Sequence, residues 1–308
     1  MLAAAAAGPH DPWQWQPHPE VWVLVAAIVG LGIYAVRVIG PKAVPAGEPV
    51  VTRRQILWFA LGVLGLWVAA DWPVHDIGET YLYSVHMVQH VLLSVVVAPL
   101  FLLATPTWLA RLVLGDGWFG GRGVRLLARP VAAAVIYNLV AVLLHWPALV
   151  DVAVRNGPLH YGLHLLLFAA ALLVWLPVCG PLPELRLSLP AQMIYLFLMS
   201  VVPTIPAAWL TLADGVVYKS YDIPYRVFGL SAVTDQQLAG LFMKLAVGGY
   251  IWLLIVILFF RWASRHEEAD RRGRVVTERE VLTWDEVRAE FDALDRLGPP
   301  PQEPAAPS

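Results

Sequence analysis

The sequence has little charge and almost no cysteine. Only 14% of its 308 residues are charged and 58% are hydrophobic, whereas soluble domains carry roughly 25% charged residues. Cys179 is the only cysteine, which excludes an internal disulfide, a CxxC redox pair and a cysteine-based zinc site. The net charge of -2 gives no reason to expect nucleic acid as a partner. The composition predicts an all-α integral membrane protein.

The N-terminus also lacks the features of a cleaved signal peptide. The first residues, MLAAAAAGPHDPWQW, contain neither a basic n-region nor a long apolar h-region. No internal repeat is evident. We therefore expect the first apolar span to direct membrane insertion itself.

Long apolar runs dominate the rest of the chain. A helix needs about 20 apolar residues to cross the hydrocarbon core. Pro99 in the third run, and Pro203 and Pro206 in the sixth, predict kinks or breaks there. Seven runs qualify as transmembrane helices within a domain over residues 20–262, and they cover 20–39, 55–71, 80–104, 130–149, 159–178, 189–212 and 236–260.

Basic residues are concentrated in alternate connections between these spans. They are Arg37, Lys42, Arg53 and Arg54 after the first span, Arg111, Arg122, Arg125 and Arg129 after the third, and Arg261 and Arg265 after the seventh. Because basic loops face the cytoplasm, this pattern places the C-terminus inside and the short segment 1–19 outside. The connections on the outer side carry acidic residues instead, namely Asp71, Asp76, Glu79, Asp151, Asp214 and Asp222.

The tail over residues 263–298 reads as cytoplasmic and soluble. Within it, residues 283–297 place apolar side chains on one helical face, and Thr283 and Glu286 form a capping box at the start. This amphipathic helix either lies solvated against the membrane surface or docks a partner. Residues 299–308 are Pro-rich and predicted to be disordered.

Five histidines fall within or at the edges of the predicted spans. His86 and His90 lie on the third, His145 on the fourth, and His160 and His164 on the fifth. Residues four apart share a helix face, so each HxxxH pair points one way. At a rise of about 1.5 Å per residue, the predicted topology places all five in the outer half of the membrane.

A shared depth favours a metal or haem site over isolated packing residues. Imidazole suits copper, zinc and haem iron, and a desolvated histidine cluster is more easily sustained by a cation than by chance burial. A polar network without metal is the alternative. Thioethers of Met87, Met199 and Met243 can add ligands that favour Cu(I), although packing accounts for each methionine separately.

Three further polar residues lie near the same face. Asp235 at the start of the seventh span is either the N-cap of its own helix or a support for the site. Lys244, about two turns deeper, needs a partner or a path for snorkelling. His75, in the outer loop, is either a metal ligand at the entrance to the site or a solvated residue. Lys244 also raises the possibility of a retinal protein, but no acidic residue lies well inside a span to serve as counter-ion.

Four segments carry a family resemblance. They are HMVQHVLLSVVVAPLFLLATP (86–106), HWP (145–147), HYGLH (160–164) and DQQLAGLFM (235–243). Over roughly residues 20 to 262 the chain resembles the CtaG-type cytochrome c oxidase assembly proteins, which are multi-spanning bacterial membrane proteins. The resemblance implies a non-enzymatic role in the bacterial cytoplasmic membrane. There the protein would handle copper for the outward-facing centre of a haem–copper oxidase, with oxidase subunits or a copper chaperone as partners.

The resemblance also implies roles for individual residues. By motif match it assigns metal ligation to His86, His90, His145, His160 and His164. Gln89 and Asp235 become supporting residues, with Met87, Met243 and Lys244 beside them, although Lys244 has no clear place in the family pattern. Two other functions stay open. One is a haem-binding electron-transfer or quinol-oxidising protein; the other is a copper transporter of the CopD kind, which a broken sixth span favours.

Overall fold

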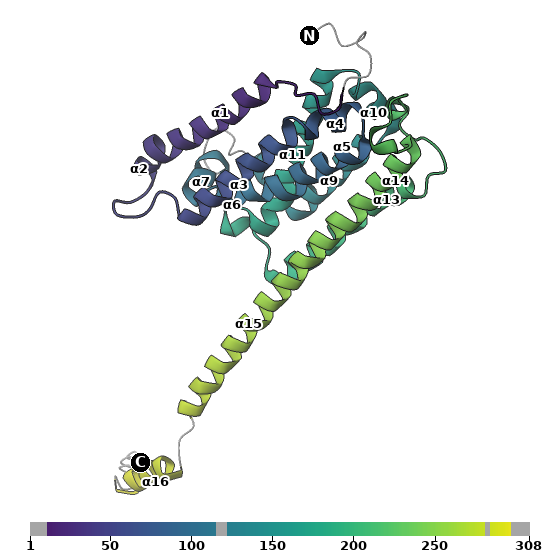
Figure 1. The fold of residues 1–308 in the computed structure, drawn as a ribbon. Coiled ribbons are helices and arrows are strands. Elements are labelled where there is room, and N and C mark those ends of the chain that lie inside the picture. Colours follow the sequence, from purple (N-terminus) through teal and green to yellow (C-terminus); the bar gives the residue numbers. More distant parts are fainter. Residues whose placement is uncertain (1–10, 115–121, 281–283, 297–308) are drawn as a thin grey trace, which may run out of the picture. The chain divides into compact units, whose positions relative to one another are not determined.

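Membrane-spanning helices account for most of the structure. In the computed structural model, which describes residues 11–114, 122–280 and 284–296, every regular element of these ranges is a helix (Figure 1). Six of the described helices are long and apolar enough to cross a membrane, and a seventh span results if one bent pair is counted together. This confirms the all-helical, polytopic fold class. The orientation of the termini stays a prediction.

The first three spans are built from several consecutive helices. Thr52 and Gln55 form a capping box at the start of α3, with Gln55 N donating to Thr52 Oγ1 over 3.2 Å and Thr52 N to Gln55 Oε1 over 2.9 Å. Helix α3 packs against α1 and α6. The elements of this half are α1 (Pro19–Tyr34), η1 (Ala35–Ile39), α2 (Gly40–Ala43), α3 (Arg53–Ala70), α4 (Val74–Thr80), α5 (Tyr83–Val91), η2 (Leu92–Val97), α6 (Ala98–Ala104), α7 (Thr107–Leu114) and α8 (Arg122–Leu127).

The second half contains the longest unbroken helices. Helix α11 packs against α9 and α6, and α14 packs against α13 and α5. The elements are α9 (Pro130–Leu144), α10 (Pro147–Ala153), α11 (Gly157–Cys179), η3 (Pro183–Leu185), α12 (Leu189–Val201), α13 (Thr204–Thr211), η4 (Lys219–Tyr221), η5 (Val227–Gly229), α14 (Ala232–Phe242), η6 (Met243–Val247), α15 (Gly248–Glu280) and α16 (Trp284–Arg296).

The fourth span differs from the prediction of one straight helix over 130–149. Helices α9 and α10 are bent by 72° where the chain passes through His145 and Trp146. Pro147 disfavours helical backbone at the residue before it, and Trp146 is extended accordingly. The bend places His145 at the end of a helix rather than inside one.

The sixth span is broken as predicted. Helix α12 ends at Val201, and Pro203 is the N-cap of α13. Proline lacks the N–H that would continue the helical hydrogen bonding. Ser200 and Thr204 side chains bond to carbonyls of the preceding turn, those of Phe197 and Ser200, over 2.7 and 3.0 Å.

The third span does not break at Pro99. It continues through that residue and changes from α-helical to π-helical hydrogen bonding just before it. The segment η2 just before Pro99 is π-helical, and a π-type bond from residue 99 would reach the carbonyl of Ser94. Pro99 has no N–H to make that bond. The indole Nε1 of Trp175 donates to Ser94 O instead, over 2.9 Å, so the buried carbonyl is satisfied from α11.

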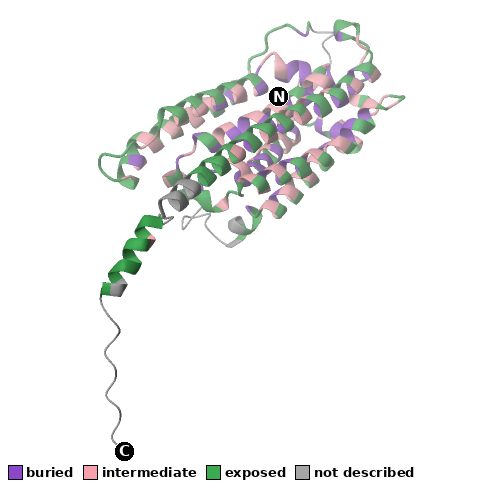
Figure 2. Cartoon of the chain, turned by 90° about the horizontal axis from the view of Figure 1, so that it is seen from below, coloured by how far each residue is buried: buried purple, intermediate pink, exposed green. Residues whose placement is uncertain are grey.

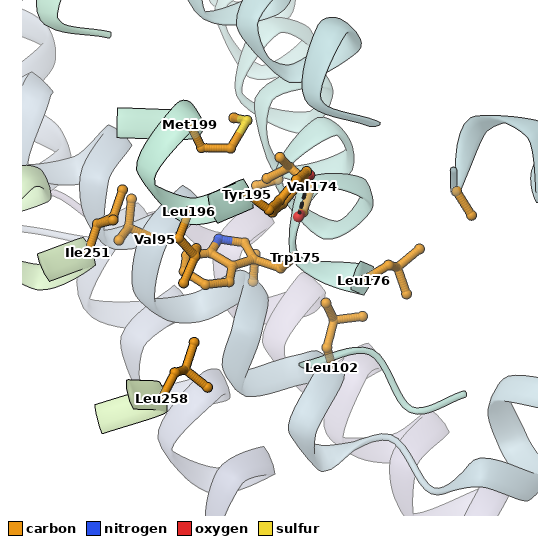
Figure 3. Close-up of a cluster of buried hydrophobic side chains, with 13 residues drawn as sticks. Val95, Leu102, Val174, Trp175, Leu176, Tyr195, Leu196, Met199, Ile251 and Leu258 are labelled. Carbon is orange, nitrogen blue, oxygen red and sulfur yellow. Dashed lines mark hydrogen bonds between the residues drawn. The ribbon is translucent and has the colours of Figure 1, made fainter. Parts of the chain in front are cut away.

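Trp175 lies in the main apolar core, which Figure 3 shows in close-up. Tyr195 OH donates to Val174 O over 3.0 Å within it. Exposed and intermediate residues line the outer faces of the helices (Figure 2). The exposed apolar residues include Val131, Leu165, Ile205 and Leu212. Apolar exposure on this scale is typical of lipid-facing surface.

Contacts divide the chain into two units, Met1–Leu258 and Phe259–Ser308. In the second unit the amphipathic helix predicted over 283–297 is present as α16, with Trp284 and Phe291 exposed. Thr283 of the predicted capping box, the Ala-rich start and the Pro-rich residues 299–308 lie outside the described residues.

Replacing Trp175 by phenylalanine tests the register change at Pro99. Trp175→Phe keeps an aromatic ring but leaves Ser94 O without a donor, which costs about 1–3 kcal/mol of unfolding free energy. Thermal unfolding of the detergent-purified protein measures the loss. Trp252→Phe is the matched control, because Trp252 is 53% exposed. Equal unfolding temperatures for the two variants would contradict this account.

Candidate metal centre

Four histidines meet at one end of the bundle, the end at which α5, α11 and α14 begin. Helix α5 carries His86 and His90, and α11 carries His160 and His164. Within each pair the ring centroids are 4.4 Å apart. Across the helices, His86 lies 5.2 Å from His160 and 5.4 Å from His164, and His90 lies 4.8 Å from His164. We call these residues the four-histidine site.

Three members of the site could share a single ion. His86, His160 and His164 each offer a ring nitrogen within 4.8 Å of the others. Two nitrogens that bind one metal at about 2 Å each lie roughly 4 Å apart at most, so small ring rotations close the set. His90 Nε2 lies 3.0 Å from His164 Nε2, which places the fourth imidazole in direct contact.

The site contains buried nitrogen atoms that lack partners. His86 Nδ1 and His160 Nε2 are buried and have no hydrogen-bond partner among the described residues. Buried polar atoms are rarely left unsatisfied, because each costs about 1–3 kcal/mol. All four rings line a cavity of about 20 Å³, which is enough for one ion or one water molecule. A cation in this cavity fits the unpaired nitrogens.

His145 lies apart from the four-histidine site, although the sequence places it at the same depth. Its Nδ1 donates to Ala141 O over 2.6 Å, and its ring lines a neighbouring cavity together with His90. The bend between α9 and α10 accounts for this position. Met87 and Met243 line the same neighbouring cavity, whereas Met199 lies in the apolar core.

Gln89, which lies between His86 and His90 on α5, belongs to a second layer of polar groups. Its Nε2 donates to Ala69 O over 2.8 Å and to His75 Nδ1 over 3.2 Å. His75 therefore carries its proton on Nε2, which donates to Glu79 over 2.9 Å. Sequence reasoning left His75 as a ligand or a solvated loop residue; it is only 2% exposed, and it belongs to helix α4. The solvated alternative is wrong.

The polar layer continues to His18, which the sequence analysis missed. His18 Nε2 lies 3.0 Å from Asp76 Oδ2, and its Nδ1 lies 3.2 Å from Glu20 Oε1. Burial lowers the pKa of His18, but the hydrogen bonds and charges of Asp76 and Glu20 outweigh burial and raise that pKa. The His18 and His75 rings are 5.1 Å apart, and the His75 and His160 rings are 6.3 Å apart, so a line of imidazoles and carboxylates leads to the four-histidine site.

No periodic pattern marks His18, because it precedes the first span. The pairing of Glu79 with His75 is predictable from the sequence, because residues four apart share a face when the segment is helical. An interpretation of the segment as a loop hides this pairing.

Asp235 supports the site through a helix other than its own. Ser231 caps α14, accepting from Thr234 N over 3.0 Å, so the prediction of Asp235 as that N-cap is wrong. Asp235 accepts from Tyr83 N over 2.6 Å, from Ser84 N over 3.2 Å, and from the Ser84 hydroxyl. It thereby satisfies free N–H groups at the start of α5, the helix that carries His86.

Lys244 has a partner away from the histidines. Its Nζ donates to Thr204 Oγ1 over 2.7 Å, and it belongs to the π-helical segment η6. The contact joins α13 to the last span. Lys244 therefore stabilises helix packing in this structure.

A layer of tyrosines adjoins His86 of the four-histidine site. Tyr83 stacks on His86 with centroids 5.8 Å apart, and it lies 4.3 Å from Tyr218 and 5.1 Å from Tyr221. Tyr221 OH donates to Gly78 O and Tyr218 OH to His145 O, each over 3.0 Å. Burial raises the pKa of Tyr218 to about 12, so its hydroxyl keeps its proton.

Comparison with known proteins identifies one family. The family model described as cytochrome c oxidase caa3 assembly factor (Caa3_CtaG) matches residues 32–265. That range includes the four-histidine site, His145, Met87, Met243 and Asp235, while His18 lies before it. No curated protein and no solved structure matches the chain.

Removing the Asp235 carboxylate tests its role at the start of α5. Asp235→Ala is expected to lower the unfolding free energy by about 1–3 kcal/mol, because two backbone N–H groups at the start of α5 lose their acceptor. Asp235→Asn keeps one acceptor oxygen and should lose less. Hydrogen exchange locates the effect, and faster exchange is expected at Tyr83 and Ser84. Faster exchange confined to the start of α14 would refute this role.

Proposed function

Since this chain belongs to the cytochrome c oxidase caa3 assembly factor family, we propose that it serves oxidase assembly by holding a copper ion in the four-histidine site. The ion is cargo, passed on to an oxidase subunit or a copper chaperone. The observation that carries the proposal is the 20 Å³ cavity lined by four imidazoles, two of which have buried nitrogens without partners.

A cation accounts for the site better than a purely polar network. A neutral imidazole has one donor and one acceptor nitrogen. In a network each should be paired, yet His86 Nδ1 and His160 Nε2 have no partner among the described residues. A metal ion accepts lone pairs from several imidazoles at once, and imidazole suits copper.

The size of the cavity favours an ion over haem. Pockets for organic ligands and cofactors enclose roughly 300–1,000 Å³, whereas the cavity lined by the four rings and neighbouring apolar side chains has about 20 Å³. The rings of His86 and His160, and those of His90 and His164, are already in contact across α5 and α11. A porphyrin would therefore have to separate these two helices. An ion needs only small ring rotations.

The surroundings suit a site that takes up and releases a cation. Asp76, Glu20 and Glu79 lie along the line from His18 to His160, with His160 Nδ1 3.9 Å from Glu79. Carboxylates and imidazoles of this kind attract a cation without enclosing it. Handing over copper requires ligand exchange and no bond chemistry on a substrate, which agrees with a non-enzymatic assembly role.

Copper binding by variants tests the proposal. The purified protein should retain about one equivalent of Cu(II) after desalting, and His86→Ala with His164→Ala should abolish it, because two of three converging ligands are lost. His266→Ala is the control, since the His266 side chain is 66% exposed in α15. Element analysis measures the copper, and thermal unfolding shows that each variant is folded. Full Cu(II) retention in the double variant would refute the site.

The same variants connect the site to assembly. In a strain that depends on this protein for its oxidase, the double variant should give an oxidase deficient in copper, with activity restored by added copper salts. His266→Ala should behave as wild type. Normal oxidase copper in the double variant would contradict the proposed function. Copper accumulation inside proteoliposomes would instead indicate transport, which the breaks at His145 and Pro203 make worth measuring.

A further inference from the structure

A second cavity lies beside the four-histidine site and has different chemistry. It encloses about 60 Å³, and its lining includes Met87, His90, His145 and Met243. We propose that this Met–His cavity is a separate binding site for the soft monovalent ion Cu(I), with Met87, Met243 and His145 as its ligands. The inference rests on the proposed function, because the ion is the same cargo.

Helix geometry makes His90 common to both sites. His86 and His90 are four residues apart and share one face of α5, while Met87, His90 and Ser94 follow a spacing of three and four and share the adjacent face. His90 consequently lines both the 20 Å³ cavity of the four-histidine site and the Met–His cavity. Of the histidines in the described part of the chain, His90 is therefore the one that lines both cavities.

The hydrogen bonding of His145 leaves a free lone pair. Ala141 O can only accept, so the 2.6 Å contact to His145 Nδ1 places the ring proton on that nitrogen. Nε2 then carries a lone pair, and it is buried without a partner among the described residues. Metal-binding histidines commonly donate their other N–H to a backbone carbonyl in this way. The Tyr218 hydroxyl, bonded to His145 O over 3.0 Å, further fixes the position.

The two methionines supply soft ligands, and Met243 does so at a greater depth than His86. Met87 and Met243 are both buried, and thioethers select Cu(I) over harder cations. Met243 lies 11 residues beyond Ala232, the first residue of α14, or roughly 16 Å along the helix at 1.5 Å per residue. His86 lies about 5 Å from the start of α5 by the same rise.

π-Helical segments adjoin the cavity on both of its main helices. η2 follows directly after α5, and η6 begins at Met243 itself. Single π-turns within α-helices are frequent at functional sites. Packing alone would explain two buried methionines, but it leaves the His145 lone pair and the open volume unexplained.

Ligand-specific loading tests the second site. The full-length protein in detergent is loaded with Cu(I) under reductant, or with Ag(I) as a redox-inert substitute, and X-ray absorption identifies the ligand atoms. We expect one equivalent with sulfur ligands. Met87→Leu with Met243→Leu should lose that equivalent while keeping one equivalent of Cu(II). Met199→Leu is the matched control, because Met199 is equally buried but lies in the apolar core.

Two further variants separate this inference from the proposed function. His86→Ala with His164→Ala should lose Cu(II) and keep sulfur-ligated Cu(I). His145→Gln should keep the sulfur ligands and lose one nitrogen ligand. Absence of sulfur ligands in the wild type, or their persistence in Met87→Leu/Met243→Leu, would overturn the second site, while retained Cu(II) binding would leave the four-histidine site standing.

Discussion

An imidazole buried among apolar helices needs a partner for each ring nitrogen, and the histidine end of this bundle is organised by that requirement. His75 meets it fully with protein groups, through Gln89 and Glu79. His145 meets it for one nitrogen only, through Ala141 O, and His86, His145 and His160 each keep one buried nitrogen without a partner in the described part of the chain. A bound cation would give the unpaired nitrogens of the four-histidine site a partner, and the assignment of a metal site depends on this argument.

The surrounding structure holds these rings in place. Asp235 fixes the start of α5 from α14, so the helix that carries His86 and His90 is tied to the last span. Trp175 donates a hydrogen bond to Ser94 O, the carbonyl that Pro99 leaves free. The third span, which carries His86 and His90, therefore continues through a π-turn rather than kinking. Tyr83 stacks on His86 and contacts Tyr218 and Tyr221, which come from the segment after α13. Each of these contacts joins segments that are distant in the sequence, so the geometry of the site depends on the whole bundle.

Much of this could be predicted from the sequence. The i, i+4 spacing of HMVQH and HYGLH fixed the two pairs to their helix faces, and the alternation of spans brought them to one depth; the family resemblance is confirmed by the match over residues 32–265. What could not be predicted depends on tertiary contacts. Pro147 turned the chain at His145 and moved that ring into a second cavity. Asp235 caps a helix other than its own, and His18 joins the polar layer through Asp76 from a segment without periodicity.

The most direct test of the metal assignment is pulsed electron paramagnetic resonance of the wild-type protein loaded with one equivalent of Cu(II). With histidine labelled by ¹⁵N, the copper signal should show coupling to at least three imidazoles, because His86, His160 and His164 offer nitrogens within 4.8 Å of one another. Copper bound without imidazole coupling, or coupled to a single imidazole, would contradict the account.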